Sequence, residues 1–316
     1  MTQINQEITD ANNHYQQYGI DVGEIFSILW KGKWIIIVIT FLFAISSVGL
    51  AIYLPNEYKA TAVVKPIESE GKDSFGALSS QLGGLASLAG VGFNSSGASN
   101  SIVAMELLKS WGFAENFIAK YDLAVPLLAA RGWDQSKNQL IIDDEKYNQN
   151  TKSWVRDAPK GKTVEPTSWE LFEEYRSRLI VDQNNETGLV NISITHYSPY
   201  IAKQWTDLLI QEINQIMKNQ ALDEANKRIQ YLESQIGQTS IAEIKTVFGE
   251  LVQEQHKTKM LAQVSDEFVF KKISEVKIPE EKDKPSRALI CIIGTLLGGL
   301  ISLMIVLLQA VVRKYR

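Results

Sequence analysis

Residues 34–54 read WIIIVITFLFAISSVGLAIYL, and residues 288–312 read ALICIIGTLLGGLISLMIVLLQAVV. Neither stretch contains a charged side chain. A helix rises about 1.5 Å per residue and a bilayer contains about 30 Å of hydrocarbon, so each stretch is long enough to cross a membrane once. Two membrane-spanning helices, one near each end of the chain, are therefore expected to decide the architecture.

A signal peptide or a soluble core helix fits these two stretches less well than a membrane span. A signal peptide has about 7–15 apolar residues and a small-residue cleavage site, whereas the first stretch is longer and leads into Tyr53-Leu54-Pro55. A core helix of a soluble protein normally carries a polar stripe, and neither stretch has one. Two membrane spans remain the better interpretation.

Basic residues flank the spans on the outer sides. Lys31 and Lys33 come just before the first span, and Arg313, Lys314 and Arg316 follow the second. Because short basic loops stay in the cytoplasm, both termini are predicted to be cytoplasmic and the middle of the chain is predicted to be exported. In a bacterium this places the chain in the inner membrane, with its main domain in the periplasm.

The chain divides into five parts on this basis. In the segment before the first span, Asp21 and Glu24 can cap a short amphipathic helix that lies on the cytoplasmic leaflet. The alternative is that this helix is a water-exposed extension of the span. The predicted parts are a cytoplasmic segment 1–33, a first transmembrane helix 34–54, an exported domain 55–287, a second transmembrane helix 288–312 and a cytoplasmic tail 313–316.

The composition of the chain indicates neither a nucleic-acid partner nor a disulfide in the exported domain. The net charge of the 316-residue chain is −4, so no basic surface indicates nucleic acid as a partner. The single cysteine, Cys291, lies within the second span, so the exported domain can form no disulfide of its own.

The exported domain is predicted to be α+β at its base. β-Branched residues favour strands at 58–66 and 268–276, and two alternating runs at 179–182 and 189–195 flank a Gly-containing turn. Helical spacing appears at 102–121, broken near Gly112, and at 169–179, opened by Thr167 or Ser168. Residues 131–167 look irregular, and the Gly/Ser-rich stretch 71–100 is expected to be a flexible loop or a loosely held helix.

A long helical hairpin, at about 198–264, is predicted to project from this base. Ser198-Pro199 opens a helix that continues to Ile236, Gly237 breaks it, and Ser240 with Glu243 caps the returning helix. A heptad seam runs along the first helix, and its polar upper part could not cover that seam alone, so neighbouring copies of the chain are expected to do so. The seam comprises Leu222, Ala225, Ile229, Leu232 and Ile236.

Small residues recur every three or four positions in both spans. Such a face lets two helices approach closely, although small residues are also common in membrane helices generally. The predicted packing residues are Gly294, Gly298 and Ser302 in the second span and Ala44, Ser47 and Ala51 in the first.

No pattern of catalytic or cofactor-binding residues stands out, and neither a metal nor a cofactor is predicted. His14, His196 and His256 are scattered, and the carboxylates of Asp143-Asp144-Glu145 and Glu173-Glu174 fit solvated positions better than an acid–base pair. Gly161-Lys162-Thr163 resembles the end of a phosphate loop, but Arg156 stands where that loop needs its first glycine. Five tryptophans could stack on sugar rings, but each alone is more often part of a core. They are Trp111, Trp133, Trp154, Trp169 and Trp205.

Four motifs resemble the polysaccharide co-polymerase family, the Wzz-type chain-length determinants, over residues 20–316. The first two are Asp21-Val-Gly-Glu with Leu29-Trp-Lys-Gly-Lys-Trp34, and Tyr58-Lys-Ala-Thr-Ala with Pro66. The others are Ser198-Pro199 with Ala202 and Trp205, and Pro279 with Pro285-Ser-Arg. They occur in an order that agrees with the two-span layout.

The resemblance implies a ring of identical subunits that sets the modal length of a lipid-linked polysaccharide made by a Wzy-type polymerase. Pro279 and Pro285 lack backbone N–H donors, so this juxtamembrane segment is expected to be a stiff link between the second span and the base. Related tyrosine autokinases end in a tyrosine-rich tail, whereas this chain ends in Arg-Lys-Tyr-Arg, so a non-enzymatic regulator is expected. The O-antigen branch is the first choice and enterobacterial common antigen the second. The alternative is a two-span sensor with a periplasmic ligand-binding domain, for which the cytoplasmic ends are short.

Overall fold

The computed structural model describes residues 29–67 and 100–314 and divides into two compact units. One unit comprises Met1–Pro55 and Pro285–Arg316, and the other comprises Asn56–Lys284. Most of the predicted amphipathic helix at 21–34 and nearly all of the Gly/Ser-rich stretch 71–100 lie outside the described residues.

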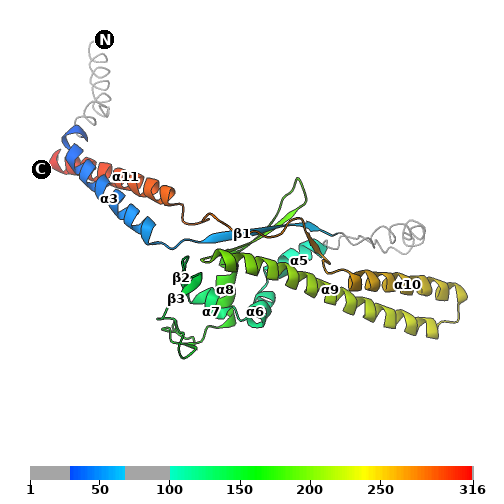
Figure 1. The fold of residues 1–316 in the computed structure, drawn as a ribbon. Helices are drawn as coiled ribbons and strands as arrows, with labels where there is room; N and C mark the ends of the chain where they lie inside the picture. Colours follow the sequence, from blue (N-terminus) through cyan, green and yellow to red (C-terminus); the bar gives the residue numbers. More distant parts are fainter. Residues whose placement is uncertain (1–28, 68–99, 315–316) are drawn as a thin grey trace, which may run out of the picture. The chain divides into compact units, whose positions relative to one another are not determined.

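The first unit is a pair of apolar helices. Helix α3 spans Lys33–Tyr53 and helix α11 spans Arg287–Lys314, and the two pack against each other (Figure 1). Both are long and apolar enough to cross a membrane, and most of their side chains are exposed within the chain. Apolar side chains on such helices need a hydrocarbon environment, so this unit fits a two-span membrane anchor.

A four-stranded antiparallel sheet organises the second unit. Its strand order is β6-β7-β1-β8, so β1 and β8, from opposite ends of the unit, lie side by side. The expected strand at 268–276 is much shorter than predicted, because only Phe270–Lys272 pairs with β1. The strands are β1 (Tyr58–Pro66), β6 (Leu179–Gln183), β7 (Val190–His196) and β8 (Phe270–Lys272).

Short helices accompany this sheet. They are α5 (Asn100–Leu108), α6 (Trp111–Lys120), α7 (Ala124–Leu128) and α8 (Ser168–Arg178). The break between α5 and α6 falls just before Gly112, at Ser110, whose hydroxyl caps α6 by accepting a hydrogen bond from Phe113 N. Thr167 caps α8 in a complete capping box with Glu170, as one of the two expected caps.

Residues 131–167 are more regular than the sequence indicates. Strands β2 (Ala130–Asp134) and β3 (Gln139–Ile142) form one hairpin, and β4 (Tyr147–Asn148) and β5 (Ser153–Trp154) form another. Asn138 and Lys152 adopt positive φ in the turns, which glycine normally marks in a sequence. These hairpins lack the hydrophobic alternation and glycine turns from which strands are predicted.

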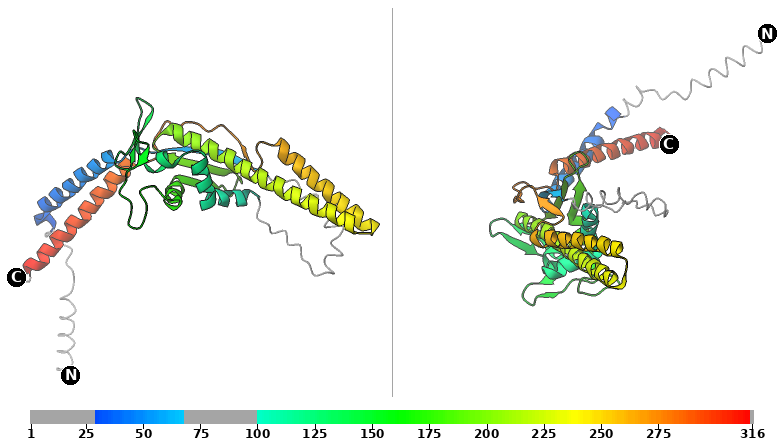
Figure 2. Two further views of the ribbon diagram at one scale, coloured as in Figure 1. Left: turned by 90° about the horizontal axis from the view of Figure 1, so that it is seen from below. Right: turned by 90° about the vertical axis from the view of Figure 1, so that its right-hand side faces the viewer.

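A long helical hairpin completes the second unit (Figure 2). Helix α9 spans Pro199–Gln238, begins at the Ser198 cap, and is followed by α10, Ala242–Val264, which packs along it. Gly237 does not break α9 but lies in its last turn. The predicted cap by Ser240 is also wrong, because α10 begins after Ile241 without a side-chain capping bond.

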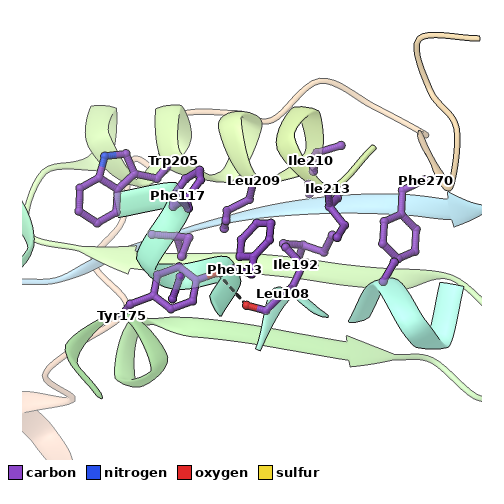
Figure 3. Close-up of a cluster of buried hydrophobic side chains, with 14 of the residues drawn as sticks. Leu108, Phe113, Phe117, Tyr175, Ile192, Trp205, Leu209, Ile210, Ile213 and Phe270 are labelled. Atoms are coloured by element: carbon purple, nitrogen blue, oxygen red, sulfur yellow. Dashed lines mark hydrogen bonds between the residues drawn. The ribbon is translucent and has the colours of Figure 1, made fainter. Parts of the chain in front are cut away.

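The hydrophobic core lies between the sheet and its helices (Figure 3). The first half of α9 crosses β1 and β7 and contributes Trp205, Leu209 and Ile213. Tyr175 on α8 reaches into the same core and donates a hydrogen bond of 2.9 Å from its hydroxyl to Leu108 O. The base of α9 is therefore fixed by tertiary packing, whereas its second half contacts α10.

Candidate functional site

The predicted small-residue faces meet at the contact between α3 and α11. A Cβ atom added to Gly294 would overlap the side chain of Ser47, and one added to Gly298 would overlap that of Phe43. Ser302 is fully buried, with its hydroxyl donating to Gly299 O, and Ala51 is buried on α3. The small residues therefore serve a helix contact within one chain.

Two further residues of this contact, Gly32 and Phe43, are absent from the sequence prediction. A Cβ at Gly32 would overlap Val306, so the beginning of α3 also approaches α11 closely. Phe43 is a large residue beside Gly298, where a search for small residues on both helices does not find it. Gly32 lies before the first span, so a spacing rule applied within the span alone misses it.

The heptad seam of α9 faces α10 of the same chain. Ala225 and Ile229 are buried, and Leu222, Leu232 and Ile236 are half-buried. The hairpin of one chain therefore covers the centre of the seam, whereas Leu222, Leu232 and Ile236 are covered only in part. The role of the seam in contacts between copies of the chain stays a prediction.

Some apolar side chains of the hairpin outside the seam remain open. Tyr231 on α9 is 65% exposed, and Met260 and Val264 on α10 are 65% and 86% exposed. These outward-facing residues are available for contacts outside the hairpin.

The segments at which the second unit begins and ends are joined to each other. Glu57 N donates to Lys284 O at 2.9 Å, and Asp283 N donates to Glu57 O at 2.8 Å. The ammonium group of Lys59 lies 3.1 Å from an Asp283 carboxylate oxygen. The predicted juxtamembrane segment with Pro279 and Pro285 therefore includes a short stretch that is tied to the start of β1.

Asn214 is a structural residue that the sequence reasoning missed. It is buried on α9, its Oδ1 accepts hydrogen bonds from Phe268, Val269 and Phe270 N, and its Nδ2 donates to Phe270 O. One side chain thus fixes the start of β8 on α9. A polar residue amid the apolar face of α9 is the sequence signal that could have pointed to it.

Arg156 and Glu170 form a partly buried ion pair at the start of α8. Two guanidinium nitrogens of Arg156 each donate to the Glu170 carboxylate at 2.9 Å. The ammonium nitrogen of Lys162 lies 3.4 Å from Glu170 Oε1. Hydrogen bonds from Arg156, followed by those from Thr167, lower the pKa of Glu170 to about 2. The sequence reasoning noticed Arg156 only as the wrong residue for a phosphate loop, whereas its role is to anchor the preceding loop.

Of the other titratable residues considered from the sequence, His14 lies outside the described residues, whereas His196, Asp143 and Glu174 have structural roles. His196 is buried between Pro126 O and Ser198 N, and burial lowers its pKa to about 4. Asp143 accepts a hydrogen bond from Glu145 N in a turn, and Glu174 pairs with Arg178. Over residues 29–67 and 100–314, no group of three His, Cys, Asp or Glu residues is arranged to hold a metal ion.

The five tryptophans separate into core and surface positions. Trp205 is 3% exposed in the core, Trp133 donates to Asn138 Oδ1, and Trp154 packs on Tyr147. Trp111 and Trp169 are instead 44% and 46% exposed and contact each other edge to face. Trp111 and Trp169 thus form an aromatic pair at the surface.

Solved structures of polysaccharide co-polymerases are similar to the chain at low identity. A full-length bacterial polysaccharide co-polymerase has 12% identity and a TM-score of 0.37, over 94% of this chain and 99% of that one. A fragment of WzzB from Salmonella Typhimurium has 11% identity and a TM-score of 0.28, over 72% of this chain and all of the fragment. A mutant of the Shigella flexneri lipopolysaccharide O-antigen chain-length regulator WzzBSF has 10% identity and a TM-score of 0.20 over the same shares.

Comparison of the amino-acid sequence with curated proteins and with protein-family models gives one match. No curated protein matches the chain, but a family model described as Wzz, chain length determinant protein, matches residues 19–121. The matched residues include all of α3, β1, α5 and α6, that is, the first apolar helix and the first elements of the base. Residues 19–121 of the chain are therefore similar to the Wzz chain length determinant family.

Proposed function

We propose that this chain is a non-enzymatic regulator of polysaccharide chain length, which sets the modal length of a lipid-linked, O-antigen-type polymer made by a Wzy-type polymerase. The observation that carries the proposal is the family match at 19–121, in a chain with an apolar helix at each end of an α+β domain. The family description names chain length as the property that is determined.

The proposal includes a location and an orientation. α3 and α11 cross the bacterial inner membrane, the domain between them lies in the periplasm, and both termini lie in the cytoplasm. The two apolar helices support a membrane anchor, and the basic residues Lys31, Lys33, Arg313, Lys314 and Arg316 support the orientation. A reporter that is active only in the periplasm would be active when inserted between β4 and β5 and inactive at either terminus.

A regulator of this kind acts on its partners by binding rather than by chemistry. Copies of the chain are proposed to form a ring, with the exposed apolar residues Tyr231, Met260 and Val264 at contacts between neighbours. Mass measurement of the purified full-length chain in detergent tests this part. A monomer at working concentration would contradict the ring.

A polysaccharide gel tests the function itself. Deletion of the gene in its host should abolish the modal cluster of long-chain bands, and a plasmid copy should restore it. Unchanged banding of every long-chain surface glycan in the deletion strain would contradict length control.

A further inference from the structure

Trp111 and Trp169 form a fixed aromatic corner on the surface of the second unit. Their ring centroids are 5.0 Å apart and their planes are inclined at 80°. Phe172, which is buried, supports both: its centroid lies 6.4 Å from Trp111 and 5.3 Å from Trp169. Contacts of this type restrict side-chain rotation, so the two exposed faces are held in place before any ligand arrives.

Helix starts on two elements position these rings. Trp111 is the first residue of α6, after the Ser110 cap, and Trp169 is the second residue of α8, after the Thr167 cap. The Arg156–Glu170 ion pair fixes the start of α8 next to Trp169. The corner therefore belongs to the packed base, in which α6 and α8 contact each other.

The indole N–H groups of Trp111 and Trp169 and two nearby carboxylates have no hydrogen-bonding or ionic partner among the described residues. Among the residues that the structure describes, neither indole N–H of the pair donates to a protein acceptor, whereas Trp133 donates to Asn138. Glu115 lies four residues after Trp111, and Glu173 four residues after Trp169, so each carboxylate shares a helix face with an indole. Both glutamates are exposed, and no described residue forms an ion pair with either of them.

Three basic side chains near the corner form ion pairs with glutamates, whereas Arg176, three residues after Glu173 on α8, is exposed and forms no ion pair with a described residue. Lys109 pairs with Glu106 at 3.1 Å, and Arg156 and Lys162 both contact Glu170. The corner thus combines apolar ring faces and N–H donors with the carboxylates of Glu115 and Glu173, which outnumber Arg176 as the unpaired charged groups among the described residues of this surface. This combination does not suit an anionic group such as a phosphate or a uronate.

We propose that Trp111 and Trp169 form a glycan-binding site that takes uncharged pyranose rings. The apolar C–H face of a sugar stacks on an indole, while its hydroxyl groups accept from the indole N–H groups and donate to Glu115 and Glu173. A lipid chain would leave these polar groups without partners, which disfavours it as the occupant. Only the identity of the glycan rests on the proposed function: it is the polymer whose length is controlled.

Calorimetric titration of the full-length chain in detergent tests the site. The probe is the surface polysaccharide of the host strain, released from its lipid by mild acid. Trp111→Ala and Trp169→Ala should each raise the Kd about tenfold or more, because each removes one stacking surface. Trp154→Ala, which removes a tryptophan on the separate β4–β5 hairpin, should leave the Kd unchanged.

Two measurements keep the test decisive if the alanine variants misfold. Trp111→Phe and Trp169→Phe keep an aromatic ring but lose the N–H donor, so they should weaken binding by a smaller factor with an unchanged circular dichroism spectrum. Equal affinity of all folded variants, or no binding by the unaltered chain at millimolar sugar, would overturn the site.

The banding pattern separates this proposal from the proposed function. If Trp111→Ala changes the modal length while polymer affinity is unchanged, the corner contacts a protein, such as a second copy of this chain, and the glycan site is overturned. If deletion of the gene leaves banding unchanged while the chain binds polymer through these tryptophans, the site stands and length control fails.

Discussion

The side chain of Asn214 exchanges two hydrogen bonds with the backbone of Phe270, donating to its carbonyl oxygen and accepting from its N–H group, each at 2.9 Å. The same Oδ1 atom also accepts from Phe268 and Val269 N. These bonds cross between α9 and the short strand that leads toward the end of the domain. They give this strand a fixed position even though it pairs with β1 over only three residues.

Asn214→Ala should destabilise the domain strongly. It leaves three backbone N–H groups and one carbonyl oxygen without their partner in a buried position, at about 1–3 kcal/mol for each group that finds no substitute. We expect a loss of at least about 3 kcal/mol of unfolding free energy, measured by denaturation of the full-length chain in detergent. Asn219→Ala is the matched control, because exposed Asn219 accepts only from Gln215 and should change stability by less than about 0.5 kcal/mol.

Glu170→Gln should lower stability at neutral pH and have less effect in acid. The folded-state pKa of Glu170 is about 2, below its usual value of 4.5, so the ionised group contributes stability above about pH 4.5. That contribution is lost as the pH falls from 4.5 toward 2. With allowance for solvent at this partly buried pair, about 1–3 kcal/mol is expected at pH 7. Melting temperatures of the variant and the unaltered chain should converge between pH 4.5 and pH 2, and a constant difference would contradict the assignment.

Gly294→Leu combined with Gly298→Leu should separate α3 from α11. Added side chains would overlap Ser47 and Phe43, whereas leucine is at least as apolar as glycine, so membrane insertion should be retained. We expect normal abundance and topology but a broadened polymer length distribution in a complemented deletion strain. Gly299→Leu is the matched control, because a Cβ at Gly299 meets nothing within 4 Å. Normal modal banding by the double variant would show that the close contact is dispensable.

Ile229→Asp should open the hairpin of a single chain. Ile229 is buried against α10, and a charge there has no partner, so hydrogen exchange along α10 should accelerate. Tyr231→Glu changes an exposed position two residues away and should leave exchange within the hairpin nearly unchanged. If Tyr231 lies between copies of the chain, Tyr231→Glu should reduce the assembled mass in detergent. An unchanged mass would exclude Tyr231 from that contact.

The elements with strong local signals were predictable from the sequence. The apolar runs predicted α3 and α11 because they are hydrophobic on all sides, and alternating residues with a turn predicted the β6–β7 hairpin. The start of α9 at Ser198 was predicted, and that of α8 was predicted at Thr167 or Ser168, because a capping side chain acts within one helical turn. These constraints come from neighbouring residues or from the membrane, so they can be recognised in one amino-acid sequence without knowledge of the tertiary structure.

The tertiary structure decided the features that depend on distant partners. The heptad spacing indicated that Ala225 and Ile229 need a partner, but spacing is the same whether that partner is α10 or another copy of the chain. The ends of the hairpin differed from prediction because Gly237 continues a helix that packing supports, and Ile241 rather than Ser240 begins the next. Trp111 and Trp169 are more than fifty residues apart in the sequence, so only the packing of α6 on α8 brings them to one surface corner. Local composition thus determined which segments are helices, strands and spans, whereas burial between segments far apart in the chain decided which faces are covered and which remain open to a ligand.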